Sequence, residues 1–233
     1  MLPVAHAQQG GWGEWVIAKT NLPDLLEKEL SGLERSGRLD AVTVFMSSAT
    51  DPYQGIERQL ELSRRSLERF CHHQIRRLLV QTRSPMVERD LELLRALGES
   101  LIVSISLETD DESVRRAITP TSASVERRLQ TCARLRDAGI FVQVAIAPMM
   151  PNHPARFAEM VAKVSDRVVL DTYFDGDGAG GRRSRALGLG ELYERLGYAR
   201  WFRPGAESEL FASLQSQMGP DRVLFSRAGF NAV

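Results

Sequence analysis

Small hydroxyl residues and a carboxylate follow an apolar run near the start of this chain. After the run at residues 41–46 come Ser47, Ser48, Thr50 and Asp51, and the chain then continues as a helical pattern. Polar side chains at the carboxyl end of a buried strand lie where α/β proteins bind ligands, because free backbone groups and side chains meet there. The pattern predicts a site for a small, polar, charged molecule.

Similar residues follow each of the later apolar runs. They are Thr82 and Arg83, then Ser104, Ser106 and Glu108, then Pro148, and finally Asp171. Any single serine or threonine has an equally good alternative role as the cap of a following helix. Right-handed crossovers bring the carboxyl ends of parallel strands to one edge, so we expect Thr50, Arg83 and Ser104 to line a common rim.

Short apolar runs alternate with amphipathic segments along most of the chain. Strands are expected at 41–47, 77–81, 101–107, 141–147 and 167–171, with a weak one at 15–19; the longer expected helices are 23–34, 54–70, 86–97, 124–138 and 154–164. Near-continuous apolar strands between helices are typical of a parallel sheet covered by helices. The sequence predicts an α/β fold, a partial (β/α) barrel of about five to six parallel strands with outer helices and a C-terminal helical extension.

The domain organisation follows from a change in composition. Residues 176–190 are rich in glycine and arginine, which is typical of a loop or linker. We expect residues 1–185 to form the partial barrel and residues 186–233 to form an extension packed on the same domain, with a short strand near 223–225. The strand at 41–47, or its neighbour near Trp15, should leave an unpaired edge with exposed apolar side chains.

Composition limits the classes of protein to consider. Of the 233 residues, 43% are hydrophobic and 26% are charged, as in ordinary globular proteins, and the formal net charge is zero. No overall field therefore draws the chain to nucleic acid or to anionic lipid. Two cysteines fit a reducing compartment, and no apolar run approaches the roughly 18 residues of a membrane span. The N-terminus lacks the regions of a signal peptide, so we expect a cytoplasmic protein without a membrane partner.

Five segments together resemble the radical S-adenosylmethionine (SAM) superfamily, in the branch similar to spore photoproduct lyase and the DNA-repair-photolyase-like proteins. They are KTN at 19–21, SSATDPYQGIE at 47–57, QTRSPMVERDLELL at 81–94, VSISLETDDESVRRAITPTSASVERRL at 103–129 and AGIFVQVAIAPMMPN at 138–152. The resemblance covers about residues 15–185. It implies a lyase-like enzyme that cleaves SAM reductively with a 4Fe-4S cluster, an unspecified electron donor, and nucleic acid as a further candidate partner.

The resemblance also implies which residues contact the cofactor. Thr50, at the family's Thr/Ser-Asp turn, belongs to the SAM pocket. Arg83 stands where the lyases have a basic residue near the SAM carboxylate, a group that a guanidinium binds with two hydrogen bonds. Ser104 matches a serine near the ribose or methionine moiety, and Pro148 matches the turn that flanks the adenine. Asp51 is a further candidate contact, although its position fits better with shaping the turn.

The cysteines depart from the family pattern. Family members ligate the cluster with a Cys-xxx-Cys-xx-Cys loop before the segment that corresponds to Trp15, and no cysteine precedes Trp15 here. Cys71 and Cys132 are expected on outer helices, whereas a cluster needs thiolates at set spacing. We therefore expect no metal ligands in this chain. Ser48 also falls near the position of a hydrogen-donating cysteine in spore photoproduct lyases, which argues against a true member of that group.

Three functional interpretations remain open. The first is a radical SAM enzyme that is truncated here, so that this chain alone is inactive. The second is a clusterless binding scaffold that retains a SAM-like ligand pocket. The third is an ordinary (β/α)-barrel lyase or isomerase that shares only the architecture of the family.

Three other sequence patterns are weaker indications of a functional site. Residues 176–181 fit GxGxxG, but no apolar helix follows, so the pattern favours a loop over a dinucleotide site. Cys71, His72 and His73 are adjacent on a helix and point about 100° apart, so they should not converge on a metal ion. The arginines between residues 64 and 77 are neutralised by Glu57, Glu61 and Glu68 and do not by themselves indicate nucleic-acid binding.

Overall fold

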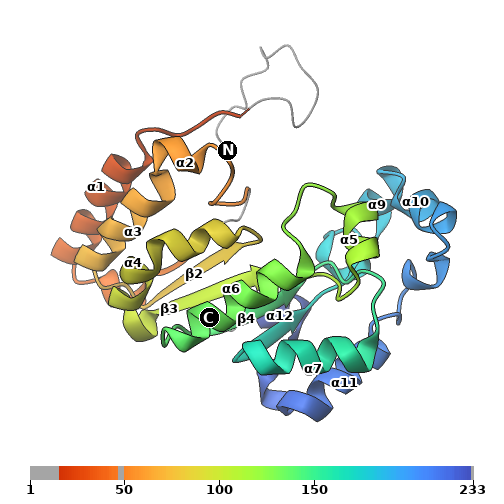
Figure 1. Ribbon diagram of the computed structural model, residues 1–233. Coiled ribbons are helices and arrows are strands. Elements are labelled where there is room, and N and C mark those ends of the chain that lie inside the picture. Colours follow the sequence, from red (N-terminus) through yellow and green to blue (C-terminus); the bar gives the residue numbers. More distant parts are fainter. Residues whose placement is uncertain (1–15, 47–49, 232–233) are drawn as a thin grey trace.

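Six parallel strands form one sheet in the order β1-β2-β3-β4-β5-β6 (Figure 1). The computed structural model describes residues 16–46 and 50–231. The strands are β1 Thr43–Met46, β2 Arg77–Thr82, β3 Leu101–Ser106, β4 Val142–Ile146, β5 Arg167–Leu170 and β6 Val223–Phe225. Each strand pairs in parallel with the next one along the chain, so all carboxyl ends lie at one edge. The predicted α/β fold with a partial, barrel-like parallel sheet is confirmed.

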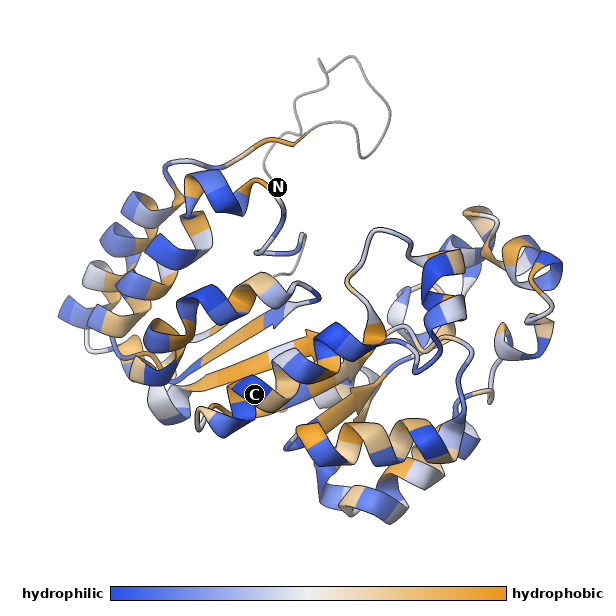
Figure 2. Ribbon diagram, in the orientation of Figure 1, coloured by the Kyte–Doolittle hydropathy of each residue, from blue (hydrophilic) through white to orange (hydrophobic). Residues whose placement is uncertain are grey.

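The longer helices cover one face of this sheet, and the short helix α12 (Ser226–Asn231) packs against Val169 on the other face. The α-helices are α1 Leu22–Arg35, α2 Glu57–Leu60, α3 Leu62–His72, α4 Leu91–Ala96, α5 Glu112–Ile118, α6 Val125–Asp137, α7 Pro154–Val164, α8 Tyr173–Gly176, α9 Arg182–Ala186, α10 Leu189–Arg195, α11 Ser208–Met218 and α12 Ser226–Asn231. Short 3-10 helices are η1 Leu39–Ala41, η2 Pro85–Asp90, η3 Gly98–Ser100, η4 Ala199–Trp201 and η5 Pro220–Arg222. Figure 2 shows apolar strands beside helices of alternating character, as expected for helices that bury one face.

The hydrophobic core lies between the sheet and its helices. Alternate residues of the central strands, such as Val103 and Ile105 of β3 and Val142 and Val144 of β4, belong to it. Successive side chains of a strand point to opposite faces, so the residues between them face the other side of the sheet. That second face is where the polar strand residues lie.

The helix expected at residues 54–70 is broken into α2 and α3. Glu61 between them adopts a left-handed conformation with φ of 48°. The carboxylate of Glu57, which is buried, accepts the N–H of Ser63 at 3.0 Å with each oxygen and so caps the start of α3. The amphipathic pattern of residues 54–70 therefore did not reveal the break at Glu61, which the buried carboxylate of Glu57 stabilises.

The prediction of a weak strand at 15–19 is wrong for residues 16–19, which have no regular secondary structure. Trp15 lies outside the described residues. The sixth strand is β6, which comes from the expected C-terminal extension and pairs with β5. A short apolar segment late in the chain thus completes the sheet.

β1 lies at one edge of the sheet, as expected. Within the described part of the chain it pairs with β2 alone, and the side chain of Phe45 is 41% exposed. No helix in the described ranges is long and apolar enough to cross a bilayer.

Glu88 joins η2 to α6 through a charged network. Its carboxylate accepts hydrogen bonds from Arg127 Nη1 at 2.6 Å, from Arg134 Nη1 at 2.8 Å and from Thr131 Oγ1 at 2.7 Å. Partial burial opposes ionisation of Glu88, but these hydrogen bonds outweigh that effect and lower its pKa to about 2. The ionised carboxylate is therefore stabilised in the folded protein.

Glu88 should make folding stability depend on acid pH. Because its pKa is lower in the folded state, its contribution is complete above the ordinary glutamate pKa and is lost as the pH falls from about 4.5 through 2. We expect the wild type to lose on the order of 3 kcal/mol more than Glu88→Gln between pH 5 and pH 2. Urea unfolding of both proteins across this range measures the difference, and parallel pH profiles would contradict the prediction.

Candidate functional site

The carboxyl edge of the sheet holds most of the polar residues expected at the site. Arg83 directly follows β2, Glu108 lies two residues after β3, and Pro148, after β4, is joined to Ala147 by a cis peptide bond. Thr50 follows β1 and is exposed, whereas Ser47 and Ser48 lie outside the described residues. The parallel strands thus bring chain segments from four βα units to one edge.

Asp51 links the turn after β1 to the end of β2. Its carboxylate accepts hydrogen bonds from the N–H of Tyr53 at 2.8 Å, from Thr82 Oγ1 at 2.6 Å and from the N–H of Arg83 at 2.9 Å. Both oxygens are therefore engaged within the protein. A role of Asp51 in ligand contact stays a prediction, while its role in shaping the turn and in positioning Arg83 follows from these bonds.

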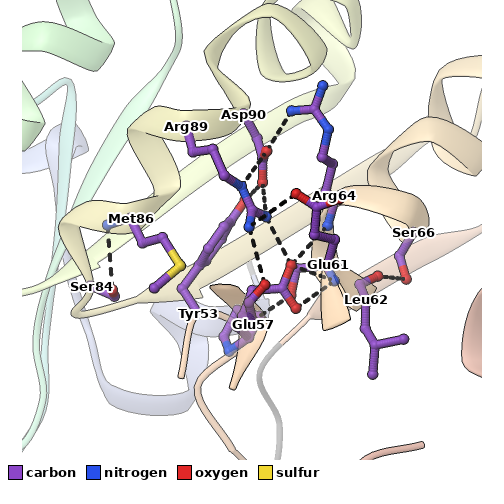
Figure 3. Close-up of polar contacts among 12 residues, drawn as sticks. Tyr53, Glu57, Glu61, Leu62, Arg64, Ser66, Ser84, Met86, Arg89 and Asp90 are labelled. Atoms are coloured by element: carbon purple, nitrogen blue, oxygen red, sulfur yellow. Dashed lines mark hydrogen bonds and ion pairs between the residues drawn. The ribbon is translucent and has the colours of Figure 1, made fainter. Parts of the chain in front are cut away.

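A buried network fixes the same turn from the other side (Figure 3). The Tyr53 hydroxyl donates to Asp90 Oδ2 at 3.0 Å, and Arg64 Nη1 and Arg89 Nε donate to Asp90 Oδ1 at 2.8 and 2.9 Å. Arg89 also reaches Glu57 Oε1 at 2.8 Å. Burial and the neighbouring Asp90 carboxylate raise the pKa of Tyr53, which keeps its hydroxyl protonated as a donor. The residues from Thr50 onward are thereby held against η2.

Glu108 is the most deeply buried acid of the rim, with a side chain that is only 1% exposed. Its Oε2 accepts from Arg128 Nη1 at 2.7 Å, and its Oε1 lies 3.3 Å from Nη2 of Arg83 in an ion pair. Within the described residues, Oε1 has no partner with hydrogen-bond geometry. Arg83 itself is 45% exposed. A cation accessible to ligand and a buried acceptor therefore lie side by side.

Arg128 is a site residue that the sequence analysis missed. It lies on α6 and shares the buried face of that helix with Val125, Cys132 and Leu135. An arginine within an apolar stripe of helical spacing was the available signal, because such a residue needs a buried anion as its partner.

Ser104 lies deeper than the rim. It is fully buried in β3, in register with Gln81 of β2 and Gln143 of β4, and its hydroxyl accepts from Gln143 Nε2 at 3.0 Å. Gln143 in turn accepts from Arg167 Nε at 2.8 Å. Ser104 is thus part of a polar row that crosses the face of the sheet opposite the helices, and its contact with a ligand stays a prediction.

The glycine-rich loop after α8 binds its own carboxylate. Asp177 Oδ1 accepts the N–H groups of Ala179 at 2.7 Å and Gly181 at 3.0 Å, and Oδ2 accepts that of Arg183 at 3.1 Å. Desolvation opposes ionisation of Asp177, but these bonds prevail and lower its pKa to about 2. The N–H groups of Ala179, Gly181 and Arg183 are therefore already bonded within the loop, which agrees with the interpretation of this segment as a loop.

The two cysteines do not form a cluster site. Cys132 is fully buried on α6, and burial raises the pKa of its thiol to about 12, while Cys71 is a half-buried residue of α3 whose Sγ lies 3.6 Å from the carbonyl oxygen of Leu93. In residues 16–46 and 50–231, no group of three or more His, Cys, Asp or Glu side chains is arranged to hold a metal ion. These thiols do not fit the three-cysteine ligation of a 4Fe-4S cluster.

Comparisons with known proteins agree with this architecture. A family model described as the radical SAM superfamily matches residues 13–164. An uncharacterized protein of Methanocaldococcus jannaschii is 31% identical over 144 residues, 61% of this chain and 51% of that protein. An uncharacterized protein of Acidianus two-tailed virus is 29% identical over 176 residues, 73% of this chain and 56% of that protein. The chain thus spans about half the length of these curated relatives.

Solved structures share the fold. A spore photoproduct lyase complexed with dinucleoside spore photoproduct superimposes with a TM-score of 0.60 at 13% identity, over 88% of this chain and 67% of that one. A variant of the lyase with bound AdoMet and the same photoproduct gives a TM-score of 0.58 at 13% identity, over 88% and 66% of the chains. At such identities the likeness concerns the fold alone.

Proposed function

Because this chain belongs to the radical SAM superfamily, we propose that the carboxyl edge of its sheet binds S-adenosylmethionine. The observation that carries the proposal is the pair formed by Arg83 and Glu108. The amino-acid end of SAM has a carboxylate and an ammonium group. A half-exposed guanidinium beside a buried carboxylate, one oxygen of which lacks a hydrogen bond, offers a complement to both.

The remaining contacts are proposed on the family resemblance. Thr50 would lie at the ligand beside Arg83, Ser104 would approach the ribose or methionine moiety, and Pro148 would flank the adenine. Asp51 supports this arrangement, since its carboxylate holds the backbone N–H of Arg83. These residues bind and orient the ligand.

No step of cluster chemistry is assigned to this chain. In the superfamily a 4Fe-4S cluster supplies the electron that cleaves SAM, and the two cysteines present do not fit its ligation. Binding of SAM is thus the function proposed for these residues, and a radical lyase would need thiolates that this chain does not contain. Binding of SAM without cluster chemistry corresponds to the clusterless scaffold of the sequence analysis.

Replacing Arg83 should weaken SAM binding selectively. Loss of a charged hydrogen-bonding partner costs roughly 1.5–3 kcal/mol, so we expect Arg83→Ala to raise the Kd for SAM about 10- to 100-fold. Isothermal titration calorimetry measures this, with 5′-methylthioadenosine as a second ligand that lacks the amino-acid group. Its Kd should change by less than about twofold.

Arg95 provides a matched control, since it is an exposed arginine of α4 at the other end of the sheet. Arg95→Ala should bind both ligands like the wild type. An equal loss of both ligands in Arg83→Ala, or no loss of either, would contradict the placement of the amino-acid group at Arg83.

A further inference from the structure

Six exposed arginines lie within one short part of the C-terminal region. They are Arg182, Arg183, Arg185, Arg195, Arg200 and Arg203, on or next to α9, α10 and η4. The same stretch holds two acidic residues, Glu191 and Glu194. Within the described part of the chain, none of the six arginines forms an ion pair. In a protein with a formal net charge of zero, this is a local excess of positive charge.

Three of these arginines converge on one loop, and we refer to Arg182, Arg183 and Arg185 as the arginine cluster. Arg182 Nε donates to the carbonyl oxygen of Ala179 at 3.1 Å, Arg183 Nη1 to that of Asp177 at 3.2 Å, and Arg185 Nη2 to that of Gly180 at 3.0 Å. The guanidinium groups are therefore gathered around four consecutive residues. Each group has five N–H donors, so donors remain for a ligand.

Among the described residues, the nearby carboxylates form no ion pair with the cluster. The Asp177 carboxylate accepts backbone N–H groups of its own loop. Asp175 is exposed, and its Oδ2 accepts the hydroxyl of Thr172 at 2.6 Å. By contrast, the arginines of α3 face acids, as in the Arg64–Asp90 ion pair at 2.8 Å. The C-terminal group thus combines exposure with a lack of ion pairs in the described residues, and its members lie close together in the chain.

Aromatic rings accompany the arginines. The guanidinium carbon of Arg185 lies 5.7 Å from the centre of the Phe174 ring, and that of Arg200 lies 5.2 Å from the centre of the Trp201 ring. The loop that carries the cluster also rests on the end of β5, since a Cβ atom at Gly176 would lie 2.6 Å from Asp171 Oδ2. Figure 1 shows α9 and α10 far from α1 and α3.

We propose that this surface binds the phosphate backbone of a nucleic acid. Guanidinium groups match phosphate oxygens with paired hydrogen bonds, and arginines interleaved with aromatic rings are typical of surfaces that bind nucleic acid without sequence preference. The cluster follows β5 at the carboxyl edge, so a bound strand would lie beside the rim. The inference goes beyond the SAM site and does not depend on it.

The test measures binding of a 20-nucleotide fluorescein-labelled DNA, single-stranded and duplex, by fluorescence anisotropy without SAM. The cluster variant is Arg182→Ala/Arg183→Ala/Arg185→Ala. The control variant is Arg58→Ala/Arg76→Ala/Arg95→Ala, which removes the same charge from exposed arginines elsewhere. We expect the cluster variant to bind at least tenfold more weakly than the wild type and the control variant to stay within about twofold.

The dependence on salt adds a second readout. Between 50 and 200 mM salt, the slope of log K against log salt should fall in magnitude by about 2 in the cluster variant, because fewer counterions are released. Equal weakening in both variants, or no binding by the wild type at 50 mM salt, would overturn the proposal. Tighter binding to phosphatidylserine vesicles than to DNA, with the same loss in the cluster variant, would assign the surface to lipid instead. Circular dichroism confirms that each variant is folded.

Discussion

Replacing Asp90 with alanine is expected to destabilise the protein by about 3–5 kcal/mol, the cost of breaking a buried ion pair on one side. The side chain of Asp90 is inaccessible to solvent and accepts hydrogen bonds from Tyr53, Arg64 and Arg89 (Figure 3). Alanine would leave two guanidinium groups and a buried hydroxyl without their shared acceptor. Urea unfolding monitored by circular dichroism measures the loss.

Asp137 supplies the control for this experiment. It is an exposed aspartate at the last position of α6, and Asp137→Ala should change the free energy of unfolding by less than about 0.5 kcal/mol. If Asp90→Ala were equally mild, the network would not stabilise the turn after β1. The turn carries Thr50 and Asp51, so we also expect Asp90→Ala to weaken SAM binding.

Removing the buried cation Arg128 should have a similar effect. Arg128→Met leaves the carboxylate of Glu108 buried with only the more distant ion pair to Arg83, and we expect a loss of about 3–5 kcal/mol. The double variant Arg128→Met/Glu108→Met removes both charges. It should lower the free energy of unfolding by less than the sum of the two single losses, because neither charge is then left buried without its partner.

Urea unfolding of the four proteins gives the coupling between the two residues. The sum of the two single losses should exceed the loss of the double variant by at least about 1 kcal/mol, which is the scale seen for residues in contact. Additive losses would mean that Glu108 and Arg128 act independently, and the acceptor at the rim would then not depend on the cation behind it.

The alternation of strands and helices could be predicted because the central strands β3 and β4 are buried on both faces. β3 is fully buried along its length and therefore reads as a continuous apolar run with two serines. The short strand expected near 223–225 is β6, but its place in the sheet was not predicted, since its pairing with β5 is a long-range contact. The break at Glu61 was also hidden, because it depends on hydrogen bonds that Glu57 makes across the turn.

For the candidate site, the sequence indicated the edge of the sheet better than the role of each residue. Arg83 and Glu108 were expected at the rim because they follow apolar runs, and the structure pairs them at 3.3 Å. Asp51 was placed correctly at the turn, yet its three hydrogen bonds come from residues up to 32 positions away. Such contacts depend on how the strands pair, which local patterns do not encode.

The hydrogen bonds of Asp177 have a consequence for the way the glycine-rich loop recognises other molecules. A carboxylate tethered within the loop acts as an intramolecular ligand, and its effective concentration exceeds that of most free anions. The amides of the loop that bond Asp177 are therefore not available to bind a free phosphate. In the same loop the carbonyl groups of Asp177, Ala179 and Gly180 accept hydrogen bonds from guanidinium groups. One acidic side chain thus converts a segment that resembles an anion receptor into a scaffold for cations.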